Sequence, residues 1–414
     1  MTVWLLLGSV WILLALVLYL ATPRWLERRS PLRLRRNYLA VALVALTMRL
    51  VPDAILPTGA LYDIESYALV ADVTLEGKAV YAEAAVQDRH PYLPLHLYWL
   101  AFSRWTSRVS EVSFVKIVRL APILADVAIA VLLCSGLAFR ATRRAAFASG
   151  LAYALNPVSI YVSAYHGQFD AIPALLLLLA LRALPRSPSH SAAWLSLGIW
   201  VKSWPVLALP GLLSSLPGWR KRLIYLGIVI ALPWMGVILY SLLFGVRPLT
   251  VILAALSYNH GVGIWGYTYP FRLLAVVDPA LRGGLDFFSE YGRYLTLLIL
   301  GAVWWFVARR QAPALGALTI LVVFLAATHA FSIQYLSWVV PLALFVRHDL
   351  WLRRFTIAAF AYMFLAYNTL ILDLNITHLL PMPQADWFLI MPAGIPAWLV
   401  TLGWARRLLM SARQ

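Results

Sequence analysis

Apolar runs long enough to cross a membrane recur along the chain, and short polar clusters separate them. A spanning helix needs about 20 consecutive, mostly apolar residues. The pattern therefore predicts an all-α polytopic membrane protein. The predicted spans are 3–21, 37–56, 114–139, 145–163, 171–184, 223–243, 291–308, 313–328, 335–347, 355–372 and 387–404.

Residues 188–216 are predicted to form two short helices rather than one span. Arg186 precedes this segment and the cluster Trp219–Arg222 follows it, and the positive-inside rule places both on the cytoplasmic side. A single crossing cannot return the chain to the side on which it started. Two half-length helices that meet at Val201–Pro205 can do so, since a proline-broken helix is tolerated where protein or water meets the freed backbone. The total is then about 13 spans.

Arginine clusters between the apolar runs set the orientation, with the N-terminus outside and the C-terminus inside. The outer segments predicted from this orientation are 57–113, 164–170, the turn at 202, 244–290, 329–334 and 373–386. Residues 3–21 lack a basic start and a cleavage site, so they are expected to be a retained helix. Residues 91–105 are apolar but short and broken by proline, and we expect them to lie along the outer interface.

Composition narrows the class of protein. The chain is 62% hydrophobic and only 12% charged, which is atypical of a soluble domain of this size. Its net charge of +17 comes from arginines in short loops, where they set orientation and meet lipid headgroups, so no nucleic-acid partner is predicted. Cys134 is the single cysteine, which excludes a disulfide framework and a cysteine-ligated metal site.

Residues 61–98 are the one long stretch that is both acidic and non-spanning. They follow a helix that the charge rule directs outward, so Asp63 and Glu65 are expected at the outer face. Carboxylates near lipid are costly unless they line a wet cavity. Other unusual polar residues fall in the same set of outer segments, which is the pattern of a site: His90, Tyr165, His166, Gln168, Asp170, Asn259, His260, Tyr267, Arg272, His329 and Gln334.

The order of these motifs resembles the C-fold (GT-C) glycosyltransferases that use polyprenyl-phosphate sugars. It is most similar to the GPI mannosyltransferase catalytic subunit and to related prokaryotic polyprenyl-phosphate mannosyl- and hexosyltransferases. The motifs run from about residue 37 to 345: Asp63-Ile64-Glu65, Tyr92–Leu95, Leu124–Asp126, Leu155–Pro157, His166–Asp170, Lys202 with Pro205, Asn259-His260, and Gln334-Tyr335 with Trp338. The family often has Asp-x-Asp where Glu65 stands here, and residues 3–21 add a helix before its usual first span.

The resemblance implies a GT-C-like bundle whose long first core outer loop carries the catalytic acid. The expected division is an extra N-terminal helix and basic loop at 1–36, a catalytic core at 37–308 with outer loops 57–113 and 244–290, and C-terminal helices at 309–414. The implied activity is inverting transfer of a hexose from a polyprenyl or dolichyl phosphate to a lipid-linked or protein acceptor. Mannose is the first candidate for the hexose. No metal or cofactor is expected beyond this lipid donor, and a small accessory subunit is a further possible partner. The site is expected on the extracytoplasmic side of the plasma membrane in a prokaryote, or of the ER membrane in a eukaryote.

Such a transfer needs a base for the acceptor hydroxyl, and Asp63 is the candidate. The alternative is that Asp63 caps a helix beginning near Ile64. Glu65 is expected to position the acceptor or to orient Asp63, and its alternative is a solvated loop acid. Lys202 is the candidate contact for the donor phosphate, against a lysine that merely anchors a helix end.

His260 and Arg272 are candidates to complete the phosphate contact, although a structural histidine and an interfacial arginine are the alternatives. The sugar or acceptor is expected to contact His166, Gln168, Asp170, Tyr92, Asn259, Gln334 and Tyr335. For Asp170 the favoured alternative is the cap of a helix starting at Ala171. Asp126 lies inside an apolar run and is expected to pair with a partner such as Arg119 or Lys116, against the alternative of a role in a cavity.

Two other classes of function remain open at this stage. A secondary transporter or lipid flippase would place charges at the middle of the membrane and show an internal twofold repeat, which is not visible in this sequence. A non-catalytic scaffold subunit of such an enzyme would be inactive alone.

Overall fold

The computed structural model describes residues 2–27, 34–136, 142–257, 261–263, 265–368 and 385–411. Helices make up 83% of the structure, and those residues contain no strand. The chain divides into two compact units, residues 1–258 and 259–414. The all-α prediction is therefore confirmed. The boundaries predicted after residues 36 and 308 separate parts of the chain by their expected role rather than by compactness, so they stay predictions.

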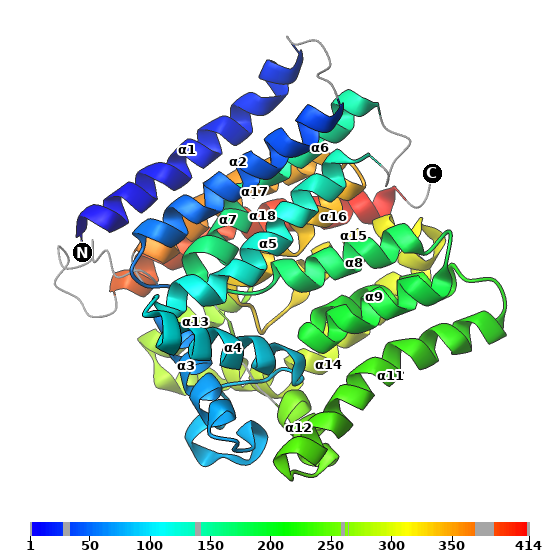
Figure 1. Cartoon of the computed structure of the whole chain (residues 1–414). Coiled ribbons are helices and arrows are strands. Elements are labelled where there is room, and N and C mark those ends of the chain that lie inside the picture. The colour runs from blue at the N-terminus through cyan, green and yellow to red at the C-terminus, as the bar shows by residue number, and fades with distance from the viewer. Residues whose placement is uncertain are drawn as a thin grey trace. The chain divides into compact units, whose positions relative to one another are not determined.

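The first unit contains two groups of neighbouring helices. In one group, α5 (Phe114–Cys134) packs against both α2 (Leu34–Ile55) and α6 (Arg143–Ala154), as Figure 1 shows. In the other, α9 (Pro188–Val201) lies between α8 (Ala171–Ala183) and α11 (Trp219–Phe244). The remaining helices of this unit are α1 (Thr2–Glu27), α3 (Leu61–Leu75), α4 (Leu95–Ser110), α7 (Pro157–Ile160), α10 (Leu209–Ser214) and α12 (Pro248–Ser257).

The second unit is built around α15 (Pro313–Ala327) and α18 (Ala385–Met410), which pack against each other. Helix α14 (Gly283–Phe306) contacts α15, and α17 (Asp349–Ala366) contacts α18. Two shorter helices complete the unit, α13 (Thr268–Val277) and α16 (Val339–Phe345).

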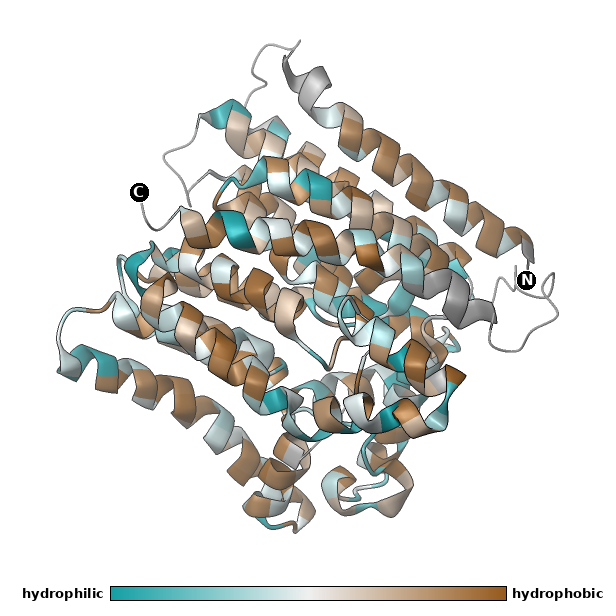
Figure 2. Cartoon of the chain, turned by 180° about the vertical axis from the view of Figure 1, so that it is seen from behind, coloured by the Kyte–Doolittle hydropathy of each residue, from teal (hydrophilic) through white to brown (hydrophobic). Residues whose placement is uncertain are grey.

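Several helices are long and apolar enough to cross a membrane. Five of the described helical segments could span a membrane by length and composition: Val3–Thr22, Asn37–Ile55, Phe114–Cys134, Trp219–Phe244 and Pro279–Arg310. Their side chains are largely apolar (Figure 2), and only 22% to 67% of each is buried within the protein. These helices are compatible with a multi-pass membrane protein. Shorter apolar helices coincide with other predicted spans, as at Ala171–Ala183 and Pro313–Ala327.

The span predicted at 145–163 is bent rather than continuous. Helix α6 ends at Ala154, and the next helical segment, Pro157–His166, lies at 41° to it. Asn156 causes the break, because its side-chain oxygen accepts hydrogen bonds from the backbone N–H groups of Val158 and Ser159. Pro157 then occupies the first helical position, where it needs no N–H partner. The segment closes with a π-helical turn at Tyr161–His166 and with Gly167, whose φ of +91° suits glycine.

The predicted break within 188–216 is confirmed. Helix α9 ends at Val201, Lys202 is extended (φ −156°, ψ 133°), and a 3₁₀ helix runs over Trp204–Ala208. Pro205 lies in the first turn of this 3₁₀ helix. The break turns the Lys202 backbone out of helical geometry, and the Lys202 side chain is buried.

A buried ion pair joins α2 and α5. The Arg49 guanidinium contacts the Asp126 carboxylate at 2.6 Å and also donates to the Ala154 carbonyl and the Ser159 hydroxyl. The Tyr153 hydroxyl donates to the other oxygen of Asp126. The prediction that Asp126 pairs with Arg119 or Lys116 was wrong. Arg49 lies directly across the helix contact, whereas the Arg119 side chain binds other groups.

Removal of one partner of this pair should destabilise the first unit. Asp126→Ala leaves the Arg49 charge buried and unpaired, which is expected to cost about 3–5 kcal/mol of unfolding free energy. The matched control is Asp286→Ala, whose pair with Arg282 is more than 60% exposed on both sides and should lose no measurable stability. Thermal unfolding of both variants in detergent checks this. Equal melting temperatures for the two variants would contradict it.

Candidate functional site

A network of polar side chains gathers in the first unit from three separate segments. Asp63 comes from the first turn of α3. His166, Gln168 and Asp170 come from the segment between the π-helical turn and α8, and Lys202 comes from the break after α9. The sequence analysis singled out all five residues, and the fold brings them into one continuous chain of contacts.

Asp63 does not cap its helix. Helix α3 begins at Leu61 after Ala60, so Asp63 lies inside the first turn, and the capping interpretation was wrong. Its Oδ2 contacts Nε2 of His166 at 2.5 Å and accepts a hydrogen bond from Nε2 of Gln168 at 2.9 Å. Because an ionised carboxylate can only accept hydrogen bonds, His166 must carry its proton on Nε2 in this contact.

The environment keeps Asp63 ionised. Burial is the largest influence and raises the pKa of the Asp63 carboxyl, but the hydrogen bonds from His166 and Gln168 and the charge of Lys202 outweigh it together. The pKa of Asp63 is therefore lower than the usual 3.8. Its side chain is 27% exposed, and its Oδ1 accepts no hydrogen bond from the residues that the structure describes. One oxygen is thus held in place while the other is open to a ligand.

Gln168 connects Asp63 to a buried ion pair. Its side-chain oxygen accepts from the Lys202 ammonium at 3.3 Å, and Lys202 also donates to Oδ2 of Asp170 at 2.9 Å. Asp170 precedes α8 but makes no side-chain capping hydrogen bond to it, so the favoured capping interpretation was wrong. Lys202 is only 5% exposed, which also contradicts a lysine that snorkels to the interface.

Aromatic rings line the same region. The Lys202 ammonium lies 4.8 Å from the ring centre of Phe169 and 5.2 Å from that of Tyr92, distances typical of cation–π contacts. His96 stacks on Phe169 with ring centres 3.5 Å apart, and Tyr67 contacts His96 edge-on and Phe169 at a tilt. Tyr92 therefore lies beside Lys202 and Phe169, together with Tyr67 and His96, which were not singled out from the sequence.

Two buried polar atoms on these rings lack a partner in the described part of the chain, the hydroxyl of Tyr67 and Nδ1 of His96. Burial raises the pKa of the Tyr67 phenol well above 10.0, so the hydroxyl keeps its proton. Burial, helped by His90 and Lys202, lowers the pKa of His96 well below 6.5 and keeps it neutral. Buried polar atoms are rarely left unpaired, so these two atoms are available to a polar ligand.

Arg119 positions the two main segments of the site, and the sequence analysis missed this role. The guanidinium of this buried residue donates through Nη2 to the carbonyls of Thr58 and Tyr165, each at 2.6 Å. Thr58 precedes α3 and Tyr165 precedes His166. Nη1 lies 3.5 Å from Asp53, which makes a looser ion pair. A charged residue inside an apolar span is the signal that identifies Arg119, but it was treated only as a partner for Asp126.

The backbone also joins these two segments. The N–H of Ala60 donates to the carbonyl of His166 at 3.0 Å. A side chain at Gly59 would lie 2.6 Å from the same carbonyl, so only glycine allows this approach. The first turn of α3 is thereby held against the residue that contacts Asp63.

Glu65 is exposed and lies outside this network, because a helix turns its side chain away from that of Asp63. Arg272, Gln334 and Tyr335 belong to the second unit. There Arg272 donates to the Val262 carbonyl, Gln334 accepts from Ser332, and Tyr335 packs on Trp338. Asn259 and His260 lie outside the described residues.

Comparison with protein-family models, with curated proteins and with solved structures found no match to this chain. The described residues also contain no group of three or more His, Cys, Asp or Glu side chains that could hold a metal ion. The chemistry available at the site therefore has to be inferred from its own side chains. They comprise one ionised and accessible carboxylate, a neighbouring ammonium, and a wall of aromatic and unpaired polar groups.

The lowered pKa of Asp63 predicts a pH dependence of stability. A carboxyl whose pKa is lower in the folded state than in the unfolded state stabilises the fold. This contribution is fully present at a pH above the unfolded pKa of 3.8, and it is lost as the pH falls through the folded pKa. Asp63→Asn should cost about 1–2 kcal/mol at pH 7, where it removes charge-assisted hydrogen bonds. As the pH falls below 3.8, the unfolding free energy of Asp63→Asn should decrease less than that of the wild type. Unfolding between pH 3 and 8 measures both curves, and curves that stay parallel at every pH would contradict the assignment.

Proposed function

We propose that this protein is an integral-membrane inverting glycosyltransferase. It transfers a hexose from a polyprenyl or dolichyl phosphate to a lipid-linked or protein acceptor on the extracytoplasmic side of the membrane. Mannose is the first candidate for the hexose. The single observation that carries the proposal is the convergence of Asp63, His166, Gln168, Asp170 and Lys202. These residues were selected from the sequence, and they form one network across more than a hundred residues of the chain.

In the proposed reaction, Asp63 acts as the base. Its free oxygen takes the proton of the acceptor hydroxyl while the acceptor oxygen attacks the anomeric carbon. The bond between that carbon and the lipid phosphate breaks, and the phosphate leaves with the bonding electrons as a monoester. Attack opposite the leaving group inverts the anomeric centre. His166 and Gln168 hold the other oxygen of Asp63 and fix the direction of the free one.

Lys202 is proposed to contact the donor phosphate. An ammonium group has three N–H donors, of which Gln168 and Asp170 engage two. The third can neutralise charge that develops on the phosphate, and a preorganised cation is effective in such a buried setting. The unpaired atoms of Tyr67 and His96 would bind sugar hydroxyls, and the rings of Tyr92 and Phe169 would pack on the sugar.

The proposed architecture is a GT-C-like bundle of about 13 spans, with the N-terminus outside and the C-terminus inside. The long apolar helices and the shorter apolar helices at predicted spans support a multi-pass helical bundle. The break at Lys202 supports the paired half-helices of residues 188–216, because it falls at the expected tip.

Asp63→Asn is expected to reduce sugar transfer by about 10²–10⁴-fold, the usual contribution of a general base. The matched control is Glu65→Gln, which removes a carboxylate two residues along the same helix that is exposed and outside the network. Transfer from a radiolabelled polyprenyl-phosphate sugar in proteoliposomes measures both. Near-native transfer by Asp63→Asn would exclude Asp63 as the base, and vesicle uptake or lipid scrambling without transfer would favour a transporter or flippase.

The proposed sidedness can be tested by cysteine labelling. Glu65→Cys places an exposed thiol beside the site, and Lys221→Cys places one in the basic cluster assigned to the inside. The native Cys134 is buried and should give little background. An impermeant maleimide added to intact cells should label position 65 and not position 221. Labelling at 221 alone would reverse the topology and remove the extracytoplasmic site.

A further inference from the structure

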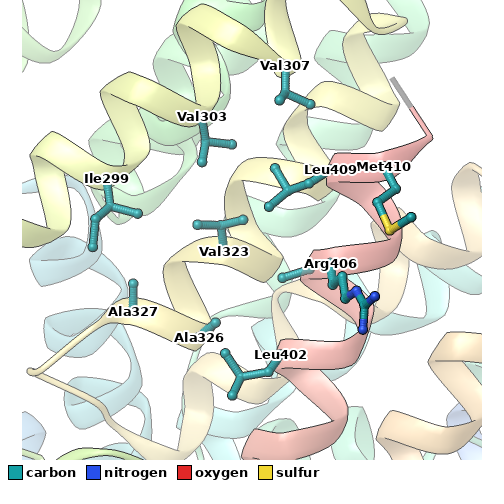
Figure 3. Close-up of a pocket in the computed structure, with 11 residues that line it drawn as sticks. Ile299, Val303, Val307, Val323, Ala326, Ala327, Leu402, Arg406, Leu409 and Met410 are labelled. Atoms are coloured by element: carbon teal, nitrogen blue, oxygen red, sulfur yellow. The ribbon is translucent and has the colours of Figure 1, made fainter. Parts of the chain in front are cut away.

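A pocket of about 600 Å³ lies within the second unit, between α14, α15 and α18. Figure 3 shows side chains from these helices around it, with Ile299, Ala327 and Leu402 toward one end and Val307, Leu409 and Met410 toward the other. The volume falls within the range of about 300–1,000 Å³ that is usual for ligand sites. This pocket takes no part in the function proposed above.

The lining of the pocket suits a hydrocarbon chain. Ile299 and Val303 lie one turn apart on α14, and Val307 follows directly after the end of this helix, so the three side chains form an apolar stripe along one side of the pocket. Ile299 and Leu402 remain partly exposed, which leaves the pocket open. Helix α14 belongs to a candidate membrane span, and Leu298 and Phe306 on the same helix are more than 60% exposed. The opening therefore lies on an element that faces lipid.

One charged residue, Arg406, lines this apolar pocket, and no acidic residue does. Its side chain is exposed, and no hydrogen bond or ion pair engages it among the described residues. Trp305 stacks under Arg309 just beyond the end of the stripe, with the guanidinium carbon 3.9 Å from the ring centre. Tryptophan and arginine together mark the level of lipid headgroups. A negative group at that level would complement Arg406.

We infer that this pocket binds an anionic phospholipid. One acyl chain lies along the apolar stripe between α14, α15 and α18, and the headgroup phosphate pairs with Arg406. An arginine pairs bidentately with a phosphate, and in an anionic phospholipid no headgroup ammonium offsets the phosphate charge. The acyl chain replaces water at the valine, leucine and alanine side chains. The bound lipid would hold the three helices together at the end where basic residues gather.

The full-length protein can test this inference. It is exchanged into nanodiscs of either phosphatidylglycerol or phosphatidylcholine with the same acyl chains, and lipid retained on release is counted by native mass spectrometry. The wild type should retain one phosphatidylglycerol molecule in preference to phosphatidylcholine. Arg406→Gln should weaken retention of phosphatidylglycerol about five-fold, the effect of one basic residue near an anionic headgroup.

Two further variants separate the headgroup from the chain. Arg407→Gln removes the adjacent arginine, which is also exposed but does not line the pocket, and it should leave retention unchanged. Val303→Phe fills the stripe with apolar volume and should remove retention of both lipids while the melting temperature stays close to that of the wild type. Equal retention of the two lipids, equal losses for Arg406→Gln and Arg407→Gln, or no lipid retained by the wild type would each overturn the inference.

Discussion

The candidate site depends on the burial of one arginine. The Arg119 guanidinium is out of contact with solvent, so its N–H groups must find acceptors inside the protein. Its Nη2 group finds them in the carbonyls of Thr58 and Tyr165, which lie shortly before Asp63 and His166, whereas Nε and Nη1 have no hydrogen-bond partner in the described part of the chain. The cost of leaving such a charge unsatisfied holds the two segments at a constant separation. The contact between Asp63 and His166 is a consequence of that arrangement.

Polar groups in this protein are satisfied in two different ways. Arg49 and Asp126 are fully engaged by each other and by Tyr153, Ala154 and Ser159, so their role is to join helices. The network around Asp63 is incomplete by comparison. One carboxylate oxygen is open, and the hydroxyl of Tyr67 has no partner in the described structure. An incomplete network that is rigidly supported is the arrangement expected of a binding or catalytic site.

The buried cations Arg49 and Lys202 differ in the same way. Arg49 has a planar group with several donors, each matched to an acceptor. Lys202 has a compact ammonium that shares its donors between Asp170 and Gln168 and lies over two aromatic rings. A ligand phosphate could share this ammonium without breaking the fold, because Asp170 and the rings would still hold its side chain.

The sequence alone determined the helical class, the break near Lys202 and most of the polar residues that meet at the site. Hydropathy, charge and proline positions act over a few turns of chain, and they can be read without knowing the fold. Partners could not be read in that way. Asp126 pairs with Arg49 rather than with its own helix, Asp170 binds Lys202 rather than capping α8, and Glu65 faces away from the site. Arg119, Tyr67 and His96 gain their roles only through neighbours from distant segments. Tertiary structure decided these points because a buried polar group binds whichever acceptor or donor the packing brings nearest, however far apart the two lie in the chain.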